Sequence, residues 1–395
     1  MKKSSAYIPV LAAALLCAVS CVYPFNPEIP SGAGGMLVIE GDILIGEISP
    51  VSVTYTAPLS NTHVRLDPVS ADVWVEDDRG GIYEVRDVEE GVYNVDMTGA
   101  DPSLQYRLHV INKDNSKEYV SAFGRCCSEP VIDSLSYIID EERGKLNIAL
   151  SMHARDESYF RWSYVEDWEY HAYFNASIKY IPPEMSTNFW GPPQPMGPGS
   201  IEPMFPESTY YCWGHHDSDA IMIFSTEKQN DDRFVDLEFL PIARDDRKIS
   251  SVYHIEVRLE PLTRDAYLYW DNMRTNSAFS ADLFTPTPSD MVGNISCVQD
   301  GSEQVIGFIN VARRAKKRLY VDNAETRFYR KIEKFDDPVE LSQGEWYHYY
   351  LNGYLPYYTE IPGNYSTTYW ALRRCVDCTV MGGTVKRPSW WLKDE

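Results

Sequence analysis

Short runs of β-branched and aromatic residues, separated by turn residues, fill the chain from residue 36 onward and constrain its fold most strongly. In the first third of the chain they recur at about 8–12-residue spacing, which is typical of strands in a β-sandwich. The segment 77–81 (DDRGG) separates two alternating runs and predicts a hairpin turn. The sequence therefore predicts a mainly β fold, with early strands at 36–45, 51–55, 71–76, 82–85, 92–97 and 106–111.

One amphipathic helix and one long loop interrupt the β pattern after residue 129. Five apolar residues from Leu262 to Met273 fall on one helical face, and Thr263 is the expected N-cap. Between Pro182 and Pro206, eight prolines exclude a helix or a central strand and predict a surface loop. The strands expected around these features are 134–139, 146–152, 159–165, 220–225, 234–240, 252–259, 305–311 and 317–321.

The pattern divides the chain into four expected segments. Residues 1–20 form a signal peptide, and residues 21–35, rich in proline and glycine, form a tether. The stretch 71–112 resembles the small immunoglobulin-like or transthyretin-like sandwich of many exported proteins, so residues 36–129 are expected to form such a domain. Residues 130–395 are expected to form a larger β-rich domain with the helix near 262–279. The expected fold is therefore two β-sandwich-like domains, the second with one amphipathic helix and long loops.

The N-terminal segment predicts export and lipidation. Two lysines precede an apolar run that ends at Val19, which is too short to span a membrane and is typical of a signal peptide. Cys21 follows a small residue, as in a bacterial lipoprotein signal, although Ala18 stands where leucine is usual. Acylation of Cys21 would anchor the chain stably, because two or more acyl chains suffice where one is marginal. Val22 favours the outer membrane, and cleavage nearby without lipidation is the alternative.

The strongly acidic composition limits the partners of the chain. There are 58 acidic and 36 basic residues, which gives a formal net charge of −22. Nucleic acid needs a basic surface and anionic lipid repels an acidic one, so neither is an expected partner through charge. Membrane association is expected through the lipid anchor alone.

The cysteine count is compatible with disulfides in an exported chain. Apart from Cys17 in the signal and Cys21, six cysteines remain, and an even number permits complete pairing. The Cys375–Cys378 spacing is CxxC, but no thioredoxin-like pattern surrounds it, which favours a structural bridge over redox chemistry. The pairing stays open among Cys126, Cys127, Cys212, Cys297, Cys375 and Cys378.

Catalytic and metal-binding motifs are missing from the sequence. It contains no HExxH, GxSxG, Walker or strand-following GxGxxG motif, so no catalytic residue, cofactor or metal is expected. The segment 215–219 (HHDSD) has no third ligand at a recognisable spacing, which favours a polar hairpin loop. Glu166 alternates with Asp167 and Glu169 along a strand, which favours a solvated strand face over a convergent acid pair. The basic run 313–318 is either a contact patch or a solvated hairpin.

Aromatic density is the strongest binding signal. Residues 345–370 hold ten aromatic residues in 26 positions, about three times the chain average of 13%. Exposed tyrosine and tryptophan favour protein interfaces and sugar stacking, and a packed aromatic core is the alternative. With the tryptophan of the proline-rich loop, the candidate binding surface comprises Trp190, Trp346, Tyr349, Tyr354, Tyr357 and Trp370.

Seven segments, taken in order, resemble one family. That family consists of uncharacterised Bacteroidota outer-membrane lipoproteins, is classed as a domain of unknown function, and is often encoded beside TonB-dependent receptors. The resemblance implies an outer-membrane location and association with such a receptor. It rests on LVIEGDI (37–43), YFRWSYVEDWEY (159–170), CW (212–213), AYLYWDNM (266–273), FTPTPSDMVGNI (284–295), VIGFINVARRAKKRLYV (305–321) and RRCVDCTVMGGTVKRPSWW (373–391).

Two hypotheses follow. In the first, the chain is a non-catalytic outer-membrane-anchored lipoprotein that serves a TonB-dependent receptor as an accessory or ligand-capture partner. In the alternative, it is a surface structural or adhesive β-sandwich module without a transport role. An envelope hydrolase is disfavoured because no catalytic motif is present.

Overall fold

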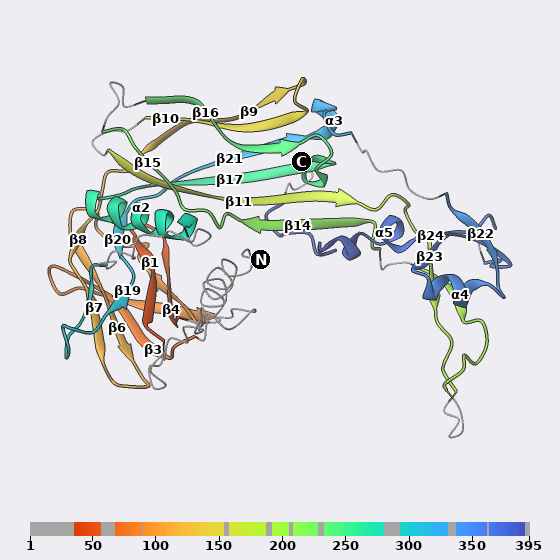
Figure 1. The fold of residues 1–395 in the computed structure, drawn as a ribbon, viewed down its shortest axis with the longest axis horizontal. Coiled ribbons are helices and arrows are strands. Elements are labelled where there is room, and N and C mark those ends of the chain that lie inside the picture. The colour runs from red at the N-terminus through yellow and green to blue at the C-terminus, as the bar shows by residue number, and fades with distance from the viewer. Residues whose placement is uncertain are drawn as a thin grey trace, which may run out of the picture.

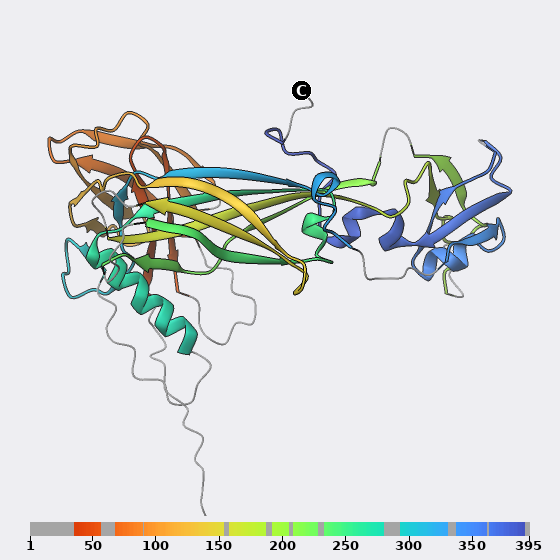
Figure 2. The same cartoon turned by 90° about the horizontal axis from the view of Figure 1, so that it is seen from above.

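The computed structural model describes residues 35–391 with gaps at 57–67, 90, 154–157, 187–191, 205–207, 228–232, 280–292, 331–336 and 362. The expected signal peptide, Cys21, residues 21–34 of the tether and Trp190 lie outside the described residues. The described part is mainly β, as the sequence predicts, and the molecule is elongated (Figures 1 and 2).

The first body is a curved sheet in which the early predicted strands are confirmed. Neighbours in this sheet run in the order β7-β6-β3-β4-β5-β2-β1. The predicted hairpin joins β3 to β4, and Asp77 Oδ1 closes it by accepting from the backbone N–H groups of Arg79 and Gly81 at 2.9 and 2.8 Å. The strands are β1 (Leu37–Leu44), β2 (Ile48–Tyr55), β3 (Ala71–Asp77), β4 (Ile82–Glu89), β5 (Val92–Asp96), β6 (Gln105–Asn112), β7 (Glu118–Ser121) and β8 (Gly124–Arg125).

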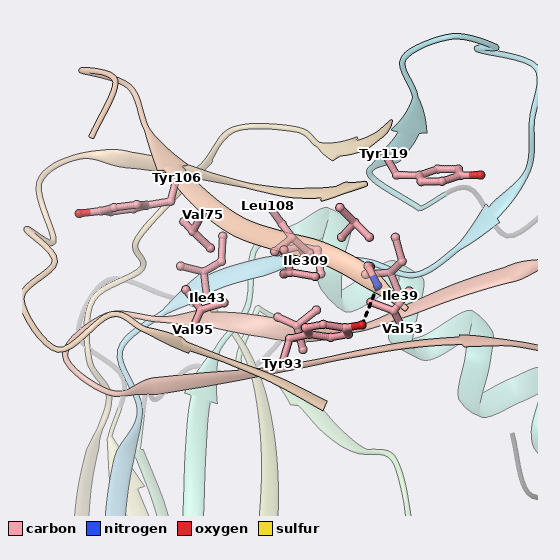
Figure 3. Packing of buried hydrophobic residues seen from close by; sticks show 14 of the residues in the cluster. Ile39, Ile43, Val53, Val75, Tyr93, Val95, Tyr106, Leu108, Tyr119 and Ile309 are labelled. Atoms are coloured by element: carbon pink, nitrogen blue, oxygen red, sulfur yellow. Dashed lines mark hydrogen bonds between the residues drawn. The ribbon is translucent and has the colours of Figure 1, made fainter. Parts of the chain in front are cut away.

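The two halves of this curved sheet pack face to face around one core. Figure 3 shows Ile39 of β1, Val75 of β3 and Leu108 of β6 gathered in the same interior, and all three are buried. The Tyr93 hydroxyl donates to the Val69 carbonyl at 2.7 Å and accepts from the Ala71 N–H at 2.8 Å, so its polar end is satisfied inside the core. This arrangement is the expected sandwich.

Residues 295–312 return to the first body, although the predicted boundary at 129/130 placed them in the second domain. The strands are β18 (Ile295–Cys297), β19 (Val305–Ile306) and β20 (Asn310–Ala312). β18 pairs with β7, while β19 and β20 both run parallel to β1, so they cover edges that would otherwise be unpaired. The expected single strand 305–311 is split at Gly307, where a Cβ would lie 2.1 Å from the Ile39 carbonyl oxygen.

The central sandwich pairs a sheet of β9, β10 and β16 with a longer sheet in the order β14-β11-β17-β21, to which β15 adds alongside β11. Leu146 and Ile148 of the first sheet share a buried core with Tyr253 and Ile255 of the second. The strands are β9 (Val131–Asp140), β10 (Lys145–His153), β11 (Tyr159–His171), β14 (Tyr211–Asp217), β15 (Met222–Ser225), β16 (Arg233–Ala243), β17 (Val252–Pro261) and β21 (Ala315–Asp322), with the short helices η1 (Arg247–Ile249) and α3 (Asn323–Thr326).

The predicted amphipathic helix is α2 (Arg264–Phe279). Thr263 is its N-cap as expected, because its Oγ1 accepts from the Ala266 N–H at 3.2 Å. Leu262 and Ala266 are buried against Ile223 of β15, which fixes the helix on the central sandwich. No helix in the described part of the chain combines the length and the apolar character needed to cross a bilayer.

A C-terminal module lies at the far end of the molecule and has its own core (Figures 1 and 2). The sequence had placed it within one large second domain. In its hairpin, β12 ends just before the predicted surface loop 182–206 and pairs with β13, so the loop prediction is wrong for residues 200–203. The rest of the module comes from residues 339–381. The elements are β12 (Ile178–Ile181), β13 (Ser200–Pro203), β22 (Val339–Ser342), β23 (Tyr354–Tyr358), β24 (Thr367–Leu372), α4 (Trp346–Leu351), α5 (Arg373–Val376) and η2 (Cys378–Met381).

Candidate ligand-binding pocket

The register of the long central sheet places polar side chains together on its outer face. Asp167 of β11 lies opposite His254 of β17 and His215 of β14. In β17 the next residue on the same face is Glu256, which lies opposite Arg318 of β21. Because alternate residues of a strand share a face, the buried Tyr253, Ile255 and Val257 series fills the core while this polar set points outward.

A pocket of about 430 Å³ lies on this outer face. The side chains of Asp167, His215, His254 and Glu256 line it, with others from β14, β17 and β21. Trp213 of β14 and Trp390 near the C-terminus supply aromatic lining. Concave sites with aromatic walls and a few convergent polar groups are the usual form of small-molecule pockets.

One wall of the pocket is the C-terminal strap, which we define as residues 382–391. After the C-terminal module the chain turns back, and the strap lies beside the long strands (Figure 2). The Trp213 N–H donates to the Thr384 carbonyl at 2.8 Å and the Thr384 N–H donates back at 2.9 Å. At Gly383 a Cβ would lie 2.3 Å from the Tyr170 hydroxyl, so this close approach requires glycine.

His215 and Asp167 form a hydrogen-bonded pair at the pocket. His215 Nδ1 lies 2.7 Å from Asp167 Oδ1, and its Nε2 lies 3.1 Å from Asp217 Oδ2. The hydrogen bond to Asp167 raises the pKa of His215. Burial works to raise the pKa of Asp167, but the contacts with His254 and His215 outweigh it, and the pKa is lowered. The pair therefore favours an ionised carboxylate beside a protonated imidazole.

His254 is buried at the pocket with unsatisfied ring nitrogens. Only 3% of the residue is exposed, and its Nδ1 lies 3.5 Å from Asp167 Oδ2, which does not make a hydrogen bond. Nε2 also has no hydrogen-bond partner in the described part of the chain. The ring packs between Tyr320 and Trp390, with centroids 4.6 and 4.8 Å away. A buried polar group without a partner costs stability, so its retention points to a ligand.

Two arginines converge on the buried carboxylate of Glu256. Arg258 Nε and Arg318 Nε lie 2.9 and 2.7 Å from its two oxygens. Burial works to raise the pKa of Glu256, and the hydrogen bonds from Arg318 and Arg258 outweigh it, so the carboxylate is held ionised. Both arginine side chains stay partly exposed, 34% for Arg258 and 60% for Arg318.

Glu166 occupies the opposite face of the sheet, as the alternation predicts. Its carboxylate accepts from the Tyr253 hydroxyl at 2.9 Å and from Lys248 Nζ at 2.7 Å, and His216 Nδ1 lies 3.0 Å away. The prediction of a solvated strand face is wrong for Glu166 and Asp167, which are 1% and 4% exposed. These carboxylates are buried because cationic and hydroxyl partners from distant segments surround them.

The prediction of a polar loop at 215–219 is wrong for residues 215–217, which belong to β14. His215 and His216 lie within β14 and pair with β11, so the adjacent histidines point to opposite faces of the sheet. No group of histidine, cysteine, aspartate and glutamate side chains within the described ranges could hold a metal ion.

The six candidate cysteines lie in different parts of the structure. Cys212 of β14 and Cys378 of η2 form a disulfide, which ties the chain just before the C-terminal strap to the central sheet. The CxxC motif is therefore split, since Cys375 lies one turn earlier in α5. Cys297 is buried in β18, and Cys126 and Cys127 follow β8.

The aromatic-rich segment 345–370 mainly builds the core of the C-terminal module. Trp346 and Trp370 are 3% and 0% exposed, so a binding surface at these two positions is ruled out. Tyr349 and Tyr354 are half-buried and pack against that core, while the half-buried Tyr357 stacks on Phe174 at 4.2 Å. The alternative of a packed aromatic core therefore describes these tryptophans.

The basic run 313–318 does not form a hairpin, because β20 pairs with β1 and β21 with β17; its residues Arg313, Lys316, Lys317 and Arg318 are exposed and Arg314 is half-buried. Arg314 Nε donates to Glu260 at 2.5 Å, Arg318 contacts Glu256, and Lys316 Nζ lies 2.7 Å from Glu47. The run supplies the cations that neutralise acids on β17 and on the first body.

Several pocket residues escaped the sequence analysis, namely Trp213, His254, Glu256, Arg258 and Trp390, whereas Arg318 belongs to the basic run 313–318 that the sequence analysis singled out. The segment 253–260 alternates apolar with polar residues, and this pattern does predict a strand with a polar outer face. The local sequence does not predict which strands pair with this one, or in which register. The strap sits more than a hundred positions away, so its contact with His254 leaves no local signal.

Comparison with known proteins places the chain in a family. Residues 22–318 match the family described as Domain of unknown function (DUF4249). The chain belongs to this family. The match confirms the expected family of unknown function. The matched region begins directly after Cys21 and includes the pocket residues Asp167, His254, Glu256 and Arg318. The C-terminal strap lies after the matched region. No curated protein matches the chain.

Proposed function

We propose that the chain is a non-catalytic lipoprotein, anchored to the outer membrane of a Bacteroidota cell through acylated Cys21, that captures a small ligand for a TonB-dependent receptor. The pocket on the central sheet carries the ligand-capture part of this proposal. It combines a built cavity of about 430 Å³, two tryptophans, and a buried histidine with unsatisfied ring nitrogens.

The signal-like N-terminus supports the anchoring part. The apolar run is followed by a small residue and Cys21, and the proline- and glycine-rich residues 22–34 lead into β1. A composition of this kind is typical of linkers. The proposal therefore places a folded binding body on a tether at the membrane surface.

The receptor partnership rests on the resemblance described above. A binding protein that is tethered beside a transporter raises the local concentration of its ligand there, because the tether keeps the loaded protein within a short distance of the transporter. This gives the pocket a physical use that a merely structural module would not need.

Membrane anchoring is tested by a matched pair of cysteine variants. Cys21→Ala is expected to move the protein from the membrane to the soluble fraction and to abolish labelling by radioactive palmitate. Cys17→Ala, in the same segment, is expected to change neither. Palmitate labelling that persists in Cys21→Ala would refute acylation at this position.

The partnership is tested by mild crosslinking followed by affinity purification of the native lipoprotein. Repeated recovery of one outer-membrane barrel protein is expected, and recovery of the lipoprotein alone would contradict the partnership. Deleting the gene separates the hypotheses further. Loss of nutrient uptake supports capture, whereas loss of surface attachment with normal uptake supports the structural or adhesive alternative.

A further inference from the structure

We propose that the pocket on the central sheet binds a small carboxylate whose remaining part is flat or apolar. This inference deepens the proposed ligand-capture function and rests on it. It follows from counting which polar groups at the pocket already have protein partners and which do not.

The carboxylates at the pocket are already satisfied by the protein. Asp167 and Asp217 each contact His215, at 2.7 and 3.1 Å. Glu256 accepts from Arg258 and Arg318. A cationic ligand would have to displace one of these partners, which would leave an arginine or a protonated histidine without its counter-charge.

The hydrogen-bond donors, by contrast, are in excess. Arg258 and Arg318 each use Nε on Glu256, and their terminal nitrogens contact no acceptor in the described part of the chain. A guanidinium group presents its remaining N–H donors in a rigid fork that matches a carboxylate. The two arginines lie on neighbouring strands, each is hydrogen-bonded to one oxygen of Glu256, and both line the pocket. The pocket therefore offers a prepared site for an anion.

His254 adds an unsatisfied group beside this site. Only 3% of the residue is exposed; Nδ1 lies 3.5 Å from Asp167 Oδ2, and within the described residues neither ring nitrogen makes a hydrogen bond. A bound oxygen acceptor would satisfy an imidazole N–H that has no hydrogen-bond partner among the described residues. This gives a second reason, independent of the arginines, to expect an acceptor-rich ligand.

The aromatic walls define the rest of the ligand. Trp390 is 44% exposed, and Trp213 lines the pocket from β14. A flat or apolar body can stack on an indole face while its carboxylate reaches the arginines. A bare inorganic anion would leave this wall unused.

Two matched pairs of probes test the proposal by isothermal titration calorimetry on the mature chain with its tether and strap. Indole-3-acetate is compared with indole-3-ethanol, and benzoate with benzyl alcohol. Within each pair the aromatic body is the same and the carboxylate is replaced by a neutral hydroxymethyl group. The carboxylate is expected to bind at least about tenfold more tightly, and its affinity is expected to fall as salt is added.

Variants of the pocket provide the control for specificity. Arg318→Gln is expected to weaken indole-3-acetate about tenfold, and Arg258→Lys, which keeps the charge but loses the fork, to weaken it by a smaller factor. Arg313→Gln is the matched control, since that arginine is 49% exposed, pairs with Glu129 at 3.1 Å and does not line the pocket. Circular dichroism melting shows that each variant remains folded.

The outcomes separate the ligand class from the wider function. Tighter binding of the alcohols than of the acids, lost in Trp390→Ala, would overturn the carboxylate class and leave ligand capture standing. An unchanged affinity in Arg318→Gln and Arg258→Lys would overturn the assigned site. Failure of all four probes to bind at millimolar concentration would overturn the carboxylate proposal, while the crosslinking experiment would still decide the receptor partnership.

Discussion

His254 lies directly across from Asp167 in the register of β17 and β11, with its Nδ1 3.5 Å from the Asp167 carboxylate. His215 lies across from the same carboxylate on the other side and is hydrogen-bonded to it. Asp167 therefore lies between two imidazole rings. It is hydrogen-bonded to His215, whereas its contact with His254 is too long for a hydrogen bond. This asymmetry distinguishes the pocket from a closed ionic network and is the feature on which the proposed ligand capture depends.

The pKa of His215 provides the first prediction. Because the hydrogen bond that His215 donates to Asp167 raises this pKa, Asp167→Asn is expected to lower it toward the ordinary value of about 6.5. The stabilisation from a raised histidine pKa is fully present below the unfolded value of about 6.5, and it is lost as pH rises through the folded value. NMR titration of the histidine ring signals measures the shift. Asp219→Asn, an exposed carboxylate nearby, is the control, and an equal shift there would contradict the assignment.

The second prediction concerns the ionic cluster that joins the first body to the central sandwich. Arg161 contacts the buried carboxylates of Asp42 and Glu260, and its guanidinium group stacks on Trp270. Arg161→Ala leaves two buried carboxylates without this partner, so the free energy of unfolding is expected to fall by about 3–5 kcal/mol. Urea denaturation measures the change.

The matched control is Arg143→Ala, because the Arg143 side chain is 80% exposed and lies 3.4 Å from Asp140. Exposed pairs contribute about 0–1 kcal/mol, so little change is expected. Equal losses in the two variants would show that the cluster is not a stabilising junction.

The third prediction concerns the disulfide. Cys212 and Cys378 are 166 positions apart, and the chain-entropy model gives about 5 kcal/mol for closing a loop of that length. The double variant Cys212→Ser, Cys378→Ser is therefore expected to release the C-terminal strap and lower the urea midpoint by up to that amount. Limited proteolysis reports the release as earlier cleavage within residues 373–391. Adding reductant should destabilise the parent chain and leave the double variant unchanged; destabilisation of both would place the effect elsewhere.

The fourth prediction separates core aromatics from surface aromatics in the segment 345–370. Trp370 is fully buried, so Trp370→Ala is expected to cost about 3–5 kcal/mol of module stability. Tyr358 is 47% exposed, and Tyr358→Ala is expected to cost less than about 1 kcal/mol. Thermal melting followed by near-ultraviolet circular dichroism compares them. A small loss in Trp370→Ala would contradict its role in the core.

Local patterns in the sequence were sufficient to predict many of the strands and the helix α2, but not β14 or the strands of the C-terminal module. Alternation along 71–76 and 106–111 placed β3 and β6, and the apolar face after Leu262 placed α2 with its Thr263 cap. These features depend on neighbours within a few residues, so a single sequence contains them.

Long-range pairing explains what the sequence did not predict. The burial of Glu166 depends on Lys248 and Tyr253, and the pocket depends on the register of strands far apart in the chain. Trp346 and Trp370 lie in a segment with many aromatic residues, but a high aromatic content is found both in buried cores and on binding surfaces. It therefore did not predict that these two side chains are buried. Tertiary contacts decided each of these cases.

The return of residues 295–312 to the first body also sets an order for folding. In a newly synthesised chain, β1 and β7 are complete long before β18, β19 and β20 exist to cover them. Until then both strands expose backbone donors and acceptors that other chains can pair with. The first body is encoded first but can finish folding only after much of the central sandwich has been made, so the nascent chain needs protection from self-association during that interval.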